Sequence, residues 1–338
     1  MKSTEKNVTL NDVAELSGVS YQTVSRVINN HPSVAEKTRK RVEEAIRVLN
    51  YRPNRAARSL VTNRSETIAI ISFGTTFYGP SQILTNITQQ AKQSGYRVSP
   101  SSVEKLEYDE LKAALDDIHS QLIDGIIMIA PIISDFMVEI KDLIGDIPFV
   151  QIDTRPQPEL ASVIIDQMYG SRLATEHLIE LGHRQIAEIS GPLNWHDAVA
   201  RHQSWEETME QHHLPHNLRA EGHWTAQSGY EAVQTLLKDG AKFTALVVAN
   251  DQMALGAIAA LDNLGLRVPD DVSVVGFDDI PEAAYFLPAL TTIRQNFSAL
   301  GKQSVDYLVS LMEDPETAIH QRVLTPELII RNSSASLR

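Results

Sequence analysis

The sequence predicts an α/β protein in which a small N-terminal helix-turn-helix head precedes a two-lobed core of doubly wound parallel sheets. The first 50 residues contain three short amphipathic helical patterns and no strand pattern. From residue 66 onward, short β-branched runs alternate with amphipathic stretches, which is typical of parallel sheets covered by helices on both faces. This part spans about 270 residues, which is generous for one such sheet, so we expect two similar lobes.

The head begins with two helices joined by a tight turn. In "TLNDVAELSG", Thr9 can cap the first helix, and Asp12 stands three residues later, at capping-box spacing. Gly18 falls in the turn before the second helix, "YQTVSRVINN", which completes a helix-turn-helix pattern. A third helix is expected over "TRKRVEEAIRVLN", with Ser33 and Glu36 as a second capping box.

The second helix has one apolar face and one hydrogen-bonding face. At about 100° per residue, Val24, Val27 and Ile28 share an arc that should be buried. The opposite arc carries hydrogen-bonding side chains, one cation and no carboxylate: Tyr21, Gln22, Ser25, Arg26 and Asn29. A small packing module with a solvated face would show the same arc, so the pattern alone leaves packing and DNA binding open.

Charge is divided unevenly along the chain. Residues 1–63 contain 11 Lys and Arg against 6 Asp and Glu, whereas the remainder contains 19 against 37. The head and linker therefore carry a net charge of +5 and the rest −18, within a total of −13. A basic head on an acidic body favours a protein in which only the head meets the phosphates of a nucleic acid.

Residues 54–65 connect the head to the core. Pro53 should end the third helix, and "NRAARSL" can form one or two helical turns with Asn54 as cap. A helix this short is unstable alone in water. The segment is therefore either a solvated linker or a hinge helix that forms only against DNA and a partner chain. In the second case Arg55 lies near phosphates and Leu60 is an apolar wedge at a base step.

The core pattern consists of strands and helices in alternation. Seven apolar runs are expected to be strands: "TIAIISF", "DGIIMIA", "PFVQID", "ASVIID", "QIAEISG", "ALVVAN" and "VSVVGFDD". Amphipathic stretches predict helices at 82–94, 109–121, 135–144, 170–182, 198–213, 228–239 and 252–265.

Polar side chains follow these strands, where open α/β sheets bind their ligands. The strand ends carry Asp153, Asp166, Asn250, Asp251, Asp278 and Asp279, and the following loops and helix starts carry Asp197, Arg201 and Trp224. Carboxylates and amides exchange hydrogen bonds with vicinal hydroxyls, and an indole face covers the C–H side of a sugar ring. The set suits a neutral polyhydroxylated ligand. Each residue also has an ordinary structural interpretation, because Asp and Asn at strand ends often cap the next helix.

Composition and motifs exclude several classes of protein. The chain contains no cysteine, which excludes disulfides, zinc–thiolate sites and thiol nucleophiles. It has no G-x-S-x-G, H-E-x-x-H, Walker or G-x-G-x-x-G motif, so we expect neither an enzyme nor a cofactor. The irregular spacing of His202, His212, His213 and His216 argues against a metal site. No secretory signal and no bilayer-spanning run is visible, so we expect a cytoplasmic protein.

Two groups of motifs resemble the lac/galactose repressor family of bacterial transcription regulators. "VTLNDVAELSGVSYQTVSRVINN" and "VAEKTRKRVEEAIRVLNYRPNRAARSL" are similar to that family's DNA-binding head and hinge. "VANDQMALGA", "SVVGFDD" and "LTTIRQNF" resemble its sugar-binding core, which is like the periplasmic sugar-binding proteins. The resemblance runs from about residue 8 to about residue 331. It implies a head at 1–53, a hinge at 54–65, one lobe at 66–166 plus 295–324, and a second lobe at 167–294 plus 325–338.

The resemblance also implies which residues bind DNA. Tyr21, Gln22 and Arg26 match residues that read base edges in the major groove, with Arg26 as a bidentate guanine reader. Leu60 matches the hinge leucine that enters the minor groove at the operator centre. The full DNA-binding set is Tyr21, Gln22, Ser25, Arg26, Asn29, Asn54, Arg55 and Leu60.

In the core, ten residues fall on the family's ligand-contact positions: Phe77, Pro80, Ile83, Asp153, Arg201, Trp224, Asn250, Asp278, Gln295 and Phe297. Two further positions depart from the family pattern, because Lys105 stands where it has an arginine and Asp197 where it has a serine. A carboxylate in place of a hydroxyl changes the acceptor count and the local charge. Asp197 either contacts the ligand and sets which sugar is accepted, or pairs with Arg201 one helical turn on.

The resemblance therefore implies a sequence-specific transcriptional repressor. A homodimer should bind double-stranded operator DNA and lose affinity for it when a saccharide inducer, such as a galactoside, binds between the lobes. A dimer is expected because the chain stops at "RNSSASLR", without a leucine-heptad tail. The alternatives are a periplasmic sugar-binding protein, a purine-type regulator with a corepressor, and an intracellular glycosidase. The basic head argues against the first and the cleft residues against the second. The paired carboxylates Asp278 and Asp279 could serve glycoside hydrolysis, but adjacent residues at a strand end point in different directions, which argues against the third.

Overall fold

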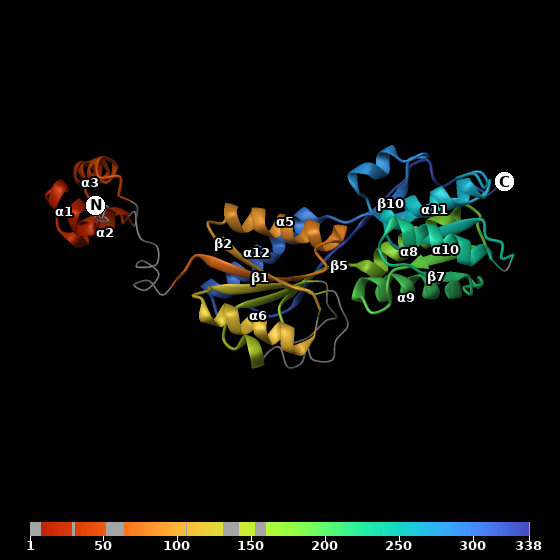
Figure 1. Cartoon of the computed structure of the whole chain (residues 1–338), viewed down its shortest axis with the longest axis horizontal. Coiled ribbons are helices and arrows are strands. Elements are labelled where there is room, and N and C mark those ends of the chain that lie inside the picture. Colours follow the sequence, from red (N-terminus) through yellow and green to blue (C-terminus); the bar gives the residue numbers. More distant parts are fainter. Residues whose placement is uncertain are drawn as a thin grey trace, which may run out of the picture. The chain divides into compact units, whose positions relative to one another are not determined.

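The computed structural model describes residues 8–28, 31–51, 64–105, 107–130, 142–152, 160–238 and 240–337. The chain divides into two compact units, Met1–Ser65 and Glu66–Arg338. The first unit contains the head, and the second contains both lobes of the core (Figure 1).

The head consists of α1 (Leu10–Ser17), α2 (Tyr21–Ile28) and α3 (Glu36–Val48). Their apolar faces meet in a small core that includes Val13, Val24, Val27, Val42, Ala45 and Tyr51. The first capping box is confirmed, because the backbone N–H of Thr9 donates to Asp12 at 2.7 Å and the Thr9 hydroxyl accepts from the Asp12 amide. Gly18 ends α1 with a φ of 61°, in the left-handed region. The helix-turn-helix is therefore present as expected.

The second capping box is wrong. The residue before α3 is Ala35, which makes no side-chain cap, so Ser33 lies two residues outside the helix. From there its hydroxyl cannot cap the first turn, and it instead hydrogen bonds with Nδ1 of His31 at 2.8 Å.

The first lobe contains a six-stranded parallel sheet. Its strands are β1 (Thr67–Phe73), β2 (Arg97–Val103), β3 (Gly125–Ile129), β4 (Phe149–Ile152), β5 (Ser162–Ile165) and β11 (Gln321–Leu324), in the order β11-β5-β4-β3-β1-β2. The helices α5 (Tyr78–Gln93) and α12 (Phe297–Glu313) cover one face, and α6 (Tyr108–Ser120) covers the other (Figure 1). Ile68 and Ile70 of β1 pack toward α5, whereas Ala69 and Ile71 pack toward α6.

The second lobe repeats this arrangement. Its strands are β6 (Ile186–Ser190), β7 (Arg219–Glu221), β8 (Ala245–Val248), β9 (Ser273–Asp278), β10 (Thr291–Arg294) and β12 (Glu327–Ile329), in the order β12-β10-β9-β8-β6-β7. Only β12 is antiparallel to its neighbour. The helices are α8 (Gln167–Glu180) and α9 (His196–Gln211), then α10 (Ala226–Leu237) and α11 (Asp251–Asn263), followed by the short 3-10 helix η1 (Pro281–Tyr285).

All seven expected strands are present, but seven elements of the described residues were not expected: β2, β7, β10, β11, β12, α12 and the short η1. The edge strands lack an apolar run because their side chains are largely exposed. In β2, for example, "RVSPSSV" buries only Val103. The helix α12 has a regular amphipathic pattern, which is the signal that predicts a helix there. The helix expected at 135–144 lies largely outside the described residues.

The sheet order brings the ligand-facing ends of the two lobes together. The chain passes between the two sheets three times: after β5, after β10 and after β11. In each lobe the strand order reverses beside the first strand, between β1 and β3 and between β6 and β8. Loops that follow strands at such a point leave a crevice, which is where doubly wound folds bind ligands.

Candidate functional site

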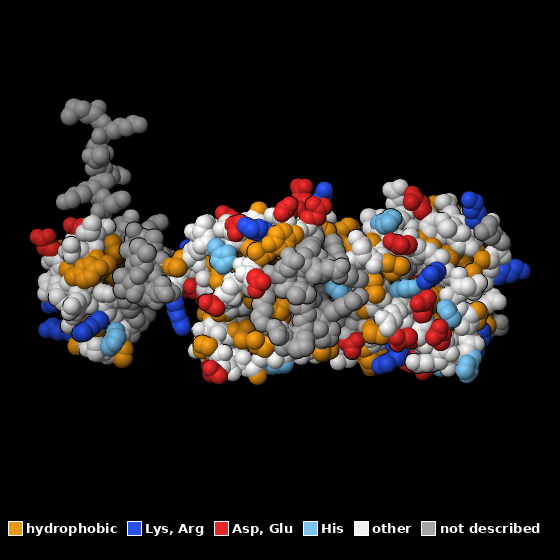
Figure 2. All heavy atoms as spheres, turned by 90° about the horizontal axis from the view of Figure 1, so that it is seen from below, with side chains coloured by type: hydrophobic (Ala, Val, Ile, Leu, Met, Phe, Trp, Pro, Cys, Tyr) orange, Lys and Arg blue, Asp and Glu red, His pale blue; other side chains and the backbone are white. Residues whose placement is uncertain are grey.

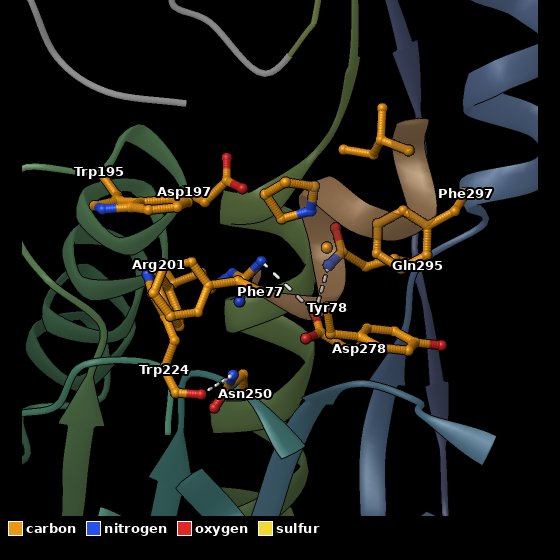
Figure 3. Close-up of a pocket in the computed structure, with 13 residues that line it drawn as sticks. Phe77, Tyr78, Trp195, Asp197, Arg201, Trp224, Asn250, Asp278, Gln295 and Phe297 are labelled. Atoms are coloured by element: carbon orange, nitrogen blue, oxygen red, sulfur yellow. Dashed lines mark hydrogen bonds and ion pairs between the residues drawn. The ribbon is translucent and has the colours of Figure 1, made fainter. Parts of the chain in front are cut away.

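A cavity lies within the core and is lined by residues of both lobes (Figure 3). Its walls are Phe77, Tyr78, Gly79, Pro80, Ile83, Trp195, Asp197, Arg201, Trp224, Asn250, Asp278, Gln295 and Phe297. The cavity volume is about 40 Å³, which is room for a few water molecules.

The structure brings ten of the twelve predicted core residues to this cavity. Lys105 is not among the lining residues; its side chain is exposed and lies 3.7 Å from Glu107. Asp153 lies outside the described residues. Tyr78, Gly79 and Trp195 were not predicted and also line the cavity. Tyr78 and Gly79 lie after β1, the first strand of the first lobe, and Trp195 lies after β6, the first strand of the second lobe. Their position after the carboxyl end of a strand is the sequence signal that could have identified them.

Arg201 is the centre of a hydrogen-bonded network on one side of the cavity. Its Nε donates to Gln167 Oε1 at 2.9 Å, its Nη1 donates to the carbonyl oxygen of Ala249, and its Nη2 lies 4.0 Å from Asp278 Oδ1. Gln295 Nε2 donates to the same Asp278 oxygen at 2.6 Å, and its own oxygen accepts from Gln167 at 2.9 Å. The network joins α8, α9, β9 and the segment after β10, and it holds these side chains in place. Figure 3 shows its contacts at Asp278 with Arg201 and Gln295.

Asn250 makes the hydrogen bonds of a helix cap. Its Oδ1 accepts from the backbone N–H of Met253 at 2.9 Å, which caps α11, and its Nδ2 donates to the carbonyl oxygen of Trp224 at 3.1 Å. Asp166 likewise caps α8. The structural interpretation of strand-end residues therefore holds for both, and for Asn250 it coexists with a place in the cavity wall.

Aromatic side chains form most of the remaining wall. Trp195 meets Trp224 edge-on with 5.7 Å between ring centroids, and it meets Phe77 of the other lobe at 5.5 Å. Tyr78 and Phe297 form a second edge-on pair at 6.0 Å. The guanidinium of Arg201 lies 5.7 Å from the Trp224 ring. The buried indole N–H of Trp224 has no hydrogen-bond partner among the residues that the structure describes.

Burial changes the acidity of the carboxyl groups. It raises the pKa of Asp278 to about 6, although Arg201 and Gln295 act in the opposite direction, and the Asp197 carboxylate raises it further. Burial also raises the pKa of Asp197, against the attraction of Arg201. Asp251 is buried behind the wall, and burial holds its pKa well above its usual range. Desolvation and the nearby Asp278 raise the pKa of Tyr78 to about 12.

Asp197 differs from Asp278 in its partners. It makes no hydrogen bond or ion pair with any described residue, and the dashed contacts of Figure 3 join Arg201 to Asp278 instead. The expected pairing of Asp197 with Arg201 is therefore absent within the described part of the chain. The carboxylate is left to face the cavity.

The second helix of the head presents the expected polar face. Val24 and Val27 are buried beneath it, whereas Gln22 and Arg26 are exposed and Tyr21 is 51% exposed. Ser25 is half-buried. Asn29, Asn54, Arg55 and Leu60 lie outside the described residues. The three base-reading candidates thus share one accessible helix face.

The surface of the core carries both basic and acidic side chains, with the acidic ones in excess. Figure 2 shows acidic groups scattered over both lobes of the core, as the net charge of −18 beyond residue 63 requires.

In the described ranges no group of three or more His, Asp or Glu could hold a metal ion. Within the same ranges, no helix is both long and apolar enough to cross a membrane.

Comparison with known families matches both units. The model for bacterial regulatory proteins of the lacI family matches residues 9–54, and the model for the periplasmic binding protein-like domain matches residues 175–334. The lactose operon repressor of Escherichia coli K12 is 39% identical over 329 residues, which covers 97% of this chain and 91% of that protein. The HTH-type transcriptional repressor PurR of Haemophilus influenzae is 36% identical over 337 residues, covering 97% and 99%.

Solved structures show the same similarity. The lac repressor dimer bound to operator and the anti-inducer ONPF has a TM-score of 0.90 at 38% identity, covering 98% of this chain and all of that one. The complex of the transcriptional regulator CelR with cellobiose has a TM-score of 0.73 at 30% identity, covering 97% and 100%.

Proposed function

Because this chain belongs to the lacI family of bacterial regulatory proteins and is a DNA-binding transcriptional repressor with an effector-binding core, not an enzyme, we propose that its effector is a saccharide bound between the core lobes. The saccharide is a galactoside or a related sugar, and its binding lowers the affinity for operator DNA.

The cavity's combination of groups carries this proposal. Trp195, Trp224 and Phe77 offer flat apolar surfaces, which cover the C–H side of a sugar ring. Asp278 and Arg201 offer an acceptor and donors in fixed positions for vicinal hydroxyls. Two relatives are named for sugars, the lactose operon repressor and the CelR–cellobiose complex.

The response follows from the small volume of the cavity. Because the cavity has a volume of only about 40 Å³ in this structure, we expect a saccharide to favour a second arrangement, in which the two lobes leave more room between them. A ligand shifts the balance between two such arrangements only by its difference in affinity for them. Reciprocity then requires operator DNA to weaken saccharide binding by the same factor.

On the DNA side, α2 enters the major groove and Tyr21, Gln22 and Arg26 read base edges. The assigned contacts of Ser25, Asn29, Asn54, Arg55 and Leu60 belong to the same proposal. The segment 54–60 becomes helical against the operator, where Leu60 enters the minor groove.

A homodimer completes the repressor, since two heads are needed to read a pseudo-palindromic operator. An apolar groove on the second lobe suits a second copy of the chain. It is lined by Leu255 and Ile258 of α11 together with Tyr285 and Leu287, which are 84% and 91% exposed. The similar lac repressor structure is a dimer.

Light scattering tests the assembly. We expect a dimer at micromolar concentration, and Leu287→Asp should shift it to monomer because a carboxylate would be desolvated in the interface. Ile319→Asp, at a 50% exposed position of the first lobe, is the matched control. A monomeric or tetrameric parent would contradict the dimer.

The effector is tested on the full chain with a fluorescent lac-type operator. A thermal-shift screen of mono- and disaccharides should identify a ligand, because ligand binding raises the melting temperature by mass action. The same ligand should then weaken operator binding. If Asp278→Ala and Arg201→Ala both keep full affinity for it, the site is wrong; if the ligand tightens operator binding, it is a corepressor.

A further inference from the structure

We propose that Asp197 makes this cavity select an uncharged effector, so that it binds a neutral saccharide and rejects the phosphorylated or carboxylated form of the same sugar. The inference rests on the saccharide proposal above and adds the charge of the ligand. Asp197 stands in the first turn of α9 and lines the cavity, beside Trp195 and one helical turn before Arg201.

The charged groups of the wall do not balance. Of the described residues that line the cavity, two are carboxylates, Asp197 and Asp278, and one is a cation, Arg201. The wall therefore carries a net charge of −1 when both carboxylates are ionised. The two carboxylates act on each other, since Asp197 raises the pKa of Asp278. A further negative charge would be placed in a site that already has an excess of them.

The unpartnered carboxylate oxygens of the wall require hydrogen-bond donors from the ligand. Asp278 uses Oδ1 for Gln295, which leaves Oδ2 without a partner among the described residues, and both oxygens of Asp197 are likewise unpartnered there. The donors without a partner among the described lining residues are Nη2 of Arg201, which lies 4.0 Å from Asp278, the indole N–H groups of Trp195 and Trp224, and the hydroxyl of Tyr78. A sugar hydroxyl both donates and accepts, whereas a phosphate or carboxylate mainly accepts. A polyol can satisfy the acceptors and the donors of this set together, whereas an anionic group supplies no proton to the two carboxylates.

The single cation is already engaged. Arg201 donates to Gln167 and to the Ala249 carbonyl, and its planar group lies 3.8 Å from the ring centroid of Phe277. These contacts hold the guanidinium beside Asp278, whose charge it already compensates. Asp197 is therefore the group that an anionic substituent on its side of the cavity would meet.

Asp197 also has an ordinary structural interpretation, because a carboxylate in the first turn of a helix interacts favourably with the helix dipole. Asp109 provides the matched comparison. It stands in the first turn of α6, is exposed, and does not line the cavity. Replacing either residue by Asn removes the same charge from the same kind of helix position, but only Asp197→Asn changes the cavity.

Calorimetry on the full-length chain tests the proposal with pairs of probes, one neutral and one carrying an anionic group on the same sugar, and the isosteric variant Asp197→Asn separates charge from size. The pairs are lactose and lactose 6-phosphate, cellobiose and cellobiose 6-phosphate, and methyl β-galactoside with the corresponding uronide. The measured quantity is the ratio of the two dissociation constants of a pair. A phosphate carries about −1.5 to −2 charges at neutral pH. We expect the anionic member to bind about 100-fold more weakly or worse in the parent chain, as like charges require in a partly desolvated site.

The variants locate the effect. Asp197→Asn and, as a second replacement, Asp197→Ser should reduce the ratio by about 10-fold or more, whereas Asp109→Asn should leave it unchanged. An anionic member that binds the parent as tightly as its neutral counterpart would overturn the charge selection. If both Asp197 variants keep the parental ratio of dissociation constants, Asp197 is not the residue that causes the charge selection. If no saccharide of either kind binds, the saccharide proposal itself has failed, which is a separate outcome.

Discussion

Trp195 of the second lobe packs edge-on against Phe77 of the first lobe, with 5.5 Å between ring centroids and 83° between ring planes. Trp195 also meets Phe73 at 5.6 Å. These contacts join the two lobes at the cavity wall, so a movement of one lobe relative to the other must change them. A ligand that moves the walls must alter them.

We expect Trp195→Ala to weaken the coupling between effector and operator. The change removes the indole from the lobe-to-lobe contact, and the cavity it leaves should lower the free energy of unfolding by about 3 kcal/mol. The ratio of operator affinities without and with the saccharide should also fall. Trp205→Phe is the control, because Trp205 is buried within the second lobe alone. If the ratio of operator affinities without and with the saccharide is unchanged in Trp195→Ala, this contact does not couple the effector site to the arrangement of the lobes.

Gly74→Ala should disturb the same contact without removing an atom. A Cβ at Gly74 would lie 2.7 Å from Cη2 of Trp195, and the residue has a φ of 69°, which L side chains rarely adopt. Gly95 is the matched control, since its φ is 87° but no atom lies within 4 Å of an added Cβ. Both substitutions strain the backbone, so the extra loss in Gly74→Ala, measured by urea unfolding, reports the steric conflict with Trp195. Equal losses would mean that the indole moves aside freely.

Arg26→Ala should weaken operator binding by about 1–3 kcal/mol and relax discrimination at one base pair. Arg26 is exposed on the polar face of α2, where a guanidinium can bind a guanine edge with two hydrogen bonds. Arg47→Ala is the control, since Arg47 pairs with Glu44 on α3. Anisotropy titrations against the operator and its single-base variants measure the effect. A variant with parental specificity at every position would remove Arg26 from base reading.

The sequence predicted the cavity better than it predicted the pairings inside it. Strand ends in a doubly wound fold meet at one edge, so the positions of Asp278 and Asn250 followed from the alternation of strands and helices, and the family resemblance supplied the rest. Trp195 was not predicted to line the cavity, because a tryptophan after a strand is usually a packing residue. Its role at the cavity depends on Phe77, which lies in the other lobe and more than 100 residues away.

The partners of Asp197 show a second limit. Helical spacing placed it one turn from Arg201, and that spacing permits an ion pair. The structure instead directs Arg201 to Gln167, Ala249 and Asp278, which come from three other parts of the chain. Competition among partners that are distant in sequence decided the pairing. The spacing of two residues on one helix cannot reveal it.

Above about pH 6, Asp278→Asn should make the chain more stable than the parent, while it abolishes effector binding. Burial raises the pKa of Asp278 from its ordinary 3.8 to about 6, so between these values the folded state binds more protons than the unfolded state. The stability of the parent therefore falls as the pH rises through this window, because the ionised carboxylate is costly to bury. Asparagine has no such group and still accepts from Gln295 through its oxygen.

The difference in unfolding free energy between Asp278→Asn and the parent should accordingly grow by about 1–2 kcal/mol from pH 5 to pH 8. Urea unfolding at the two pH values measures it, with Asp109→Asn as the exposed control. Saccharide affinity should be lost in Asp278→Asn at both, since the free carboxylate oxygen becomes an amide that donates. A carboxylate kept at a cost in stability is best explained by ligand binding. A difference that stays constant with pH, or an unimpaired saccharide affinity, would separate Asp278 from that role.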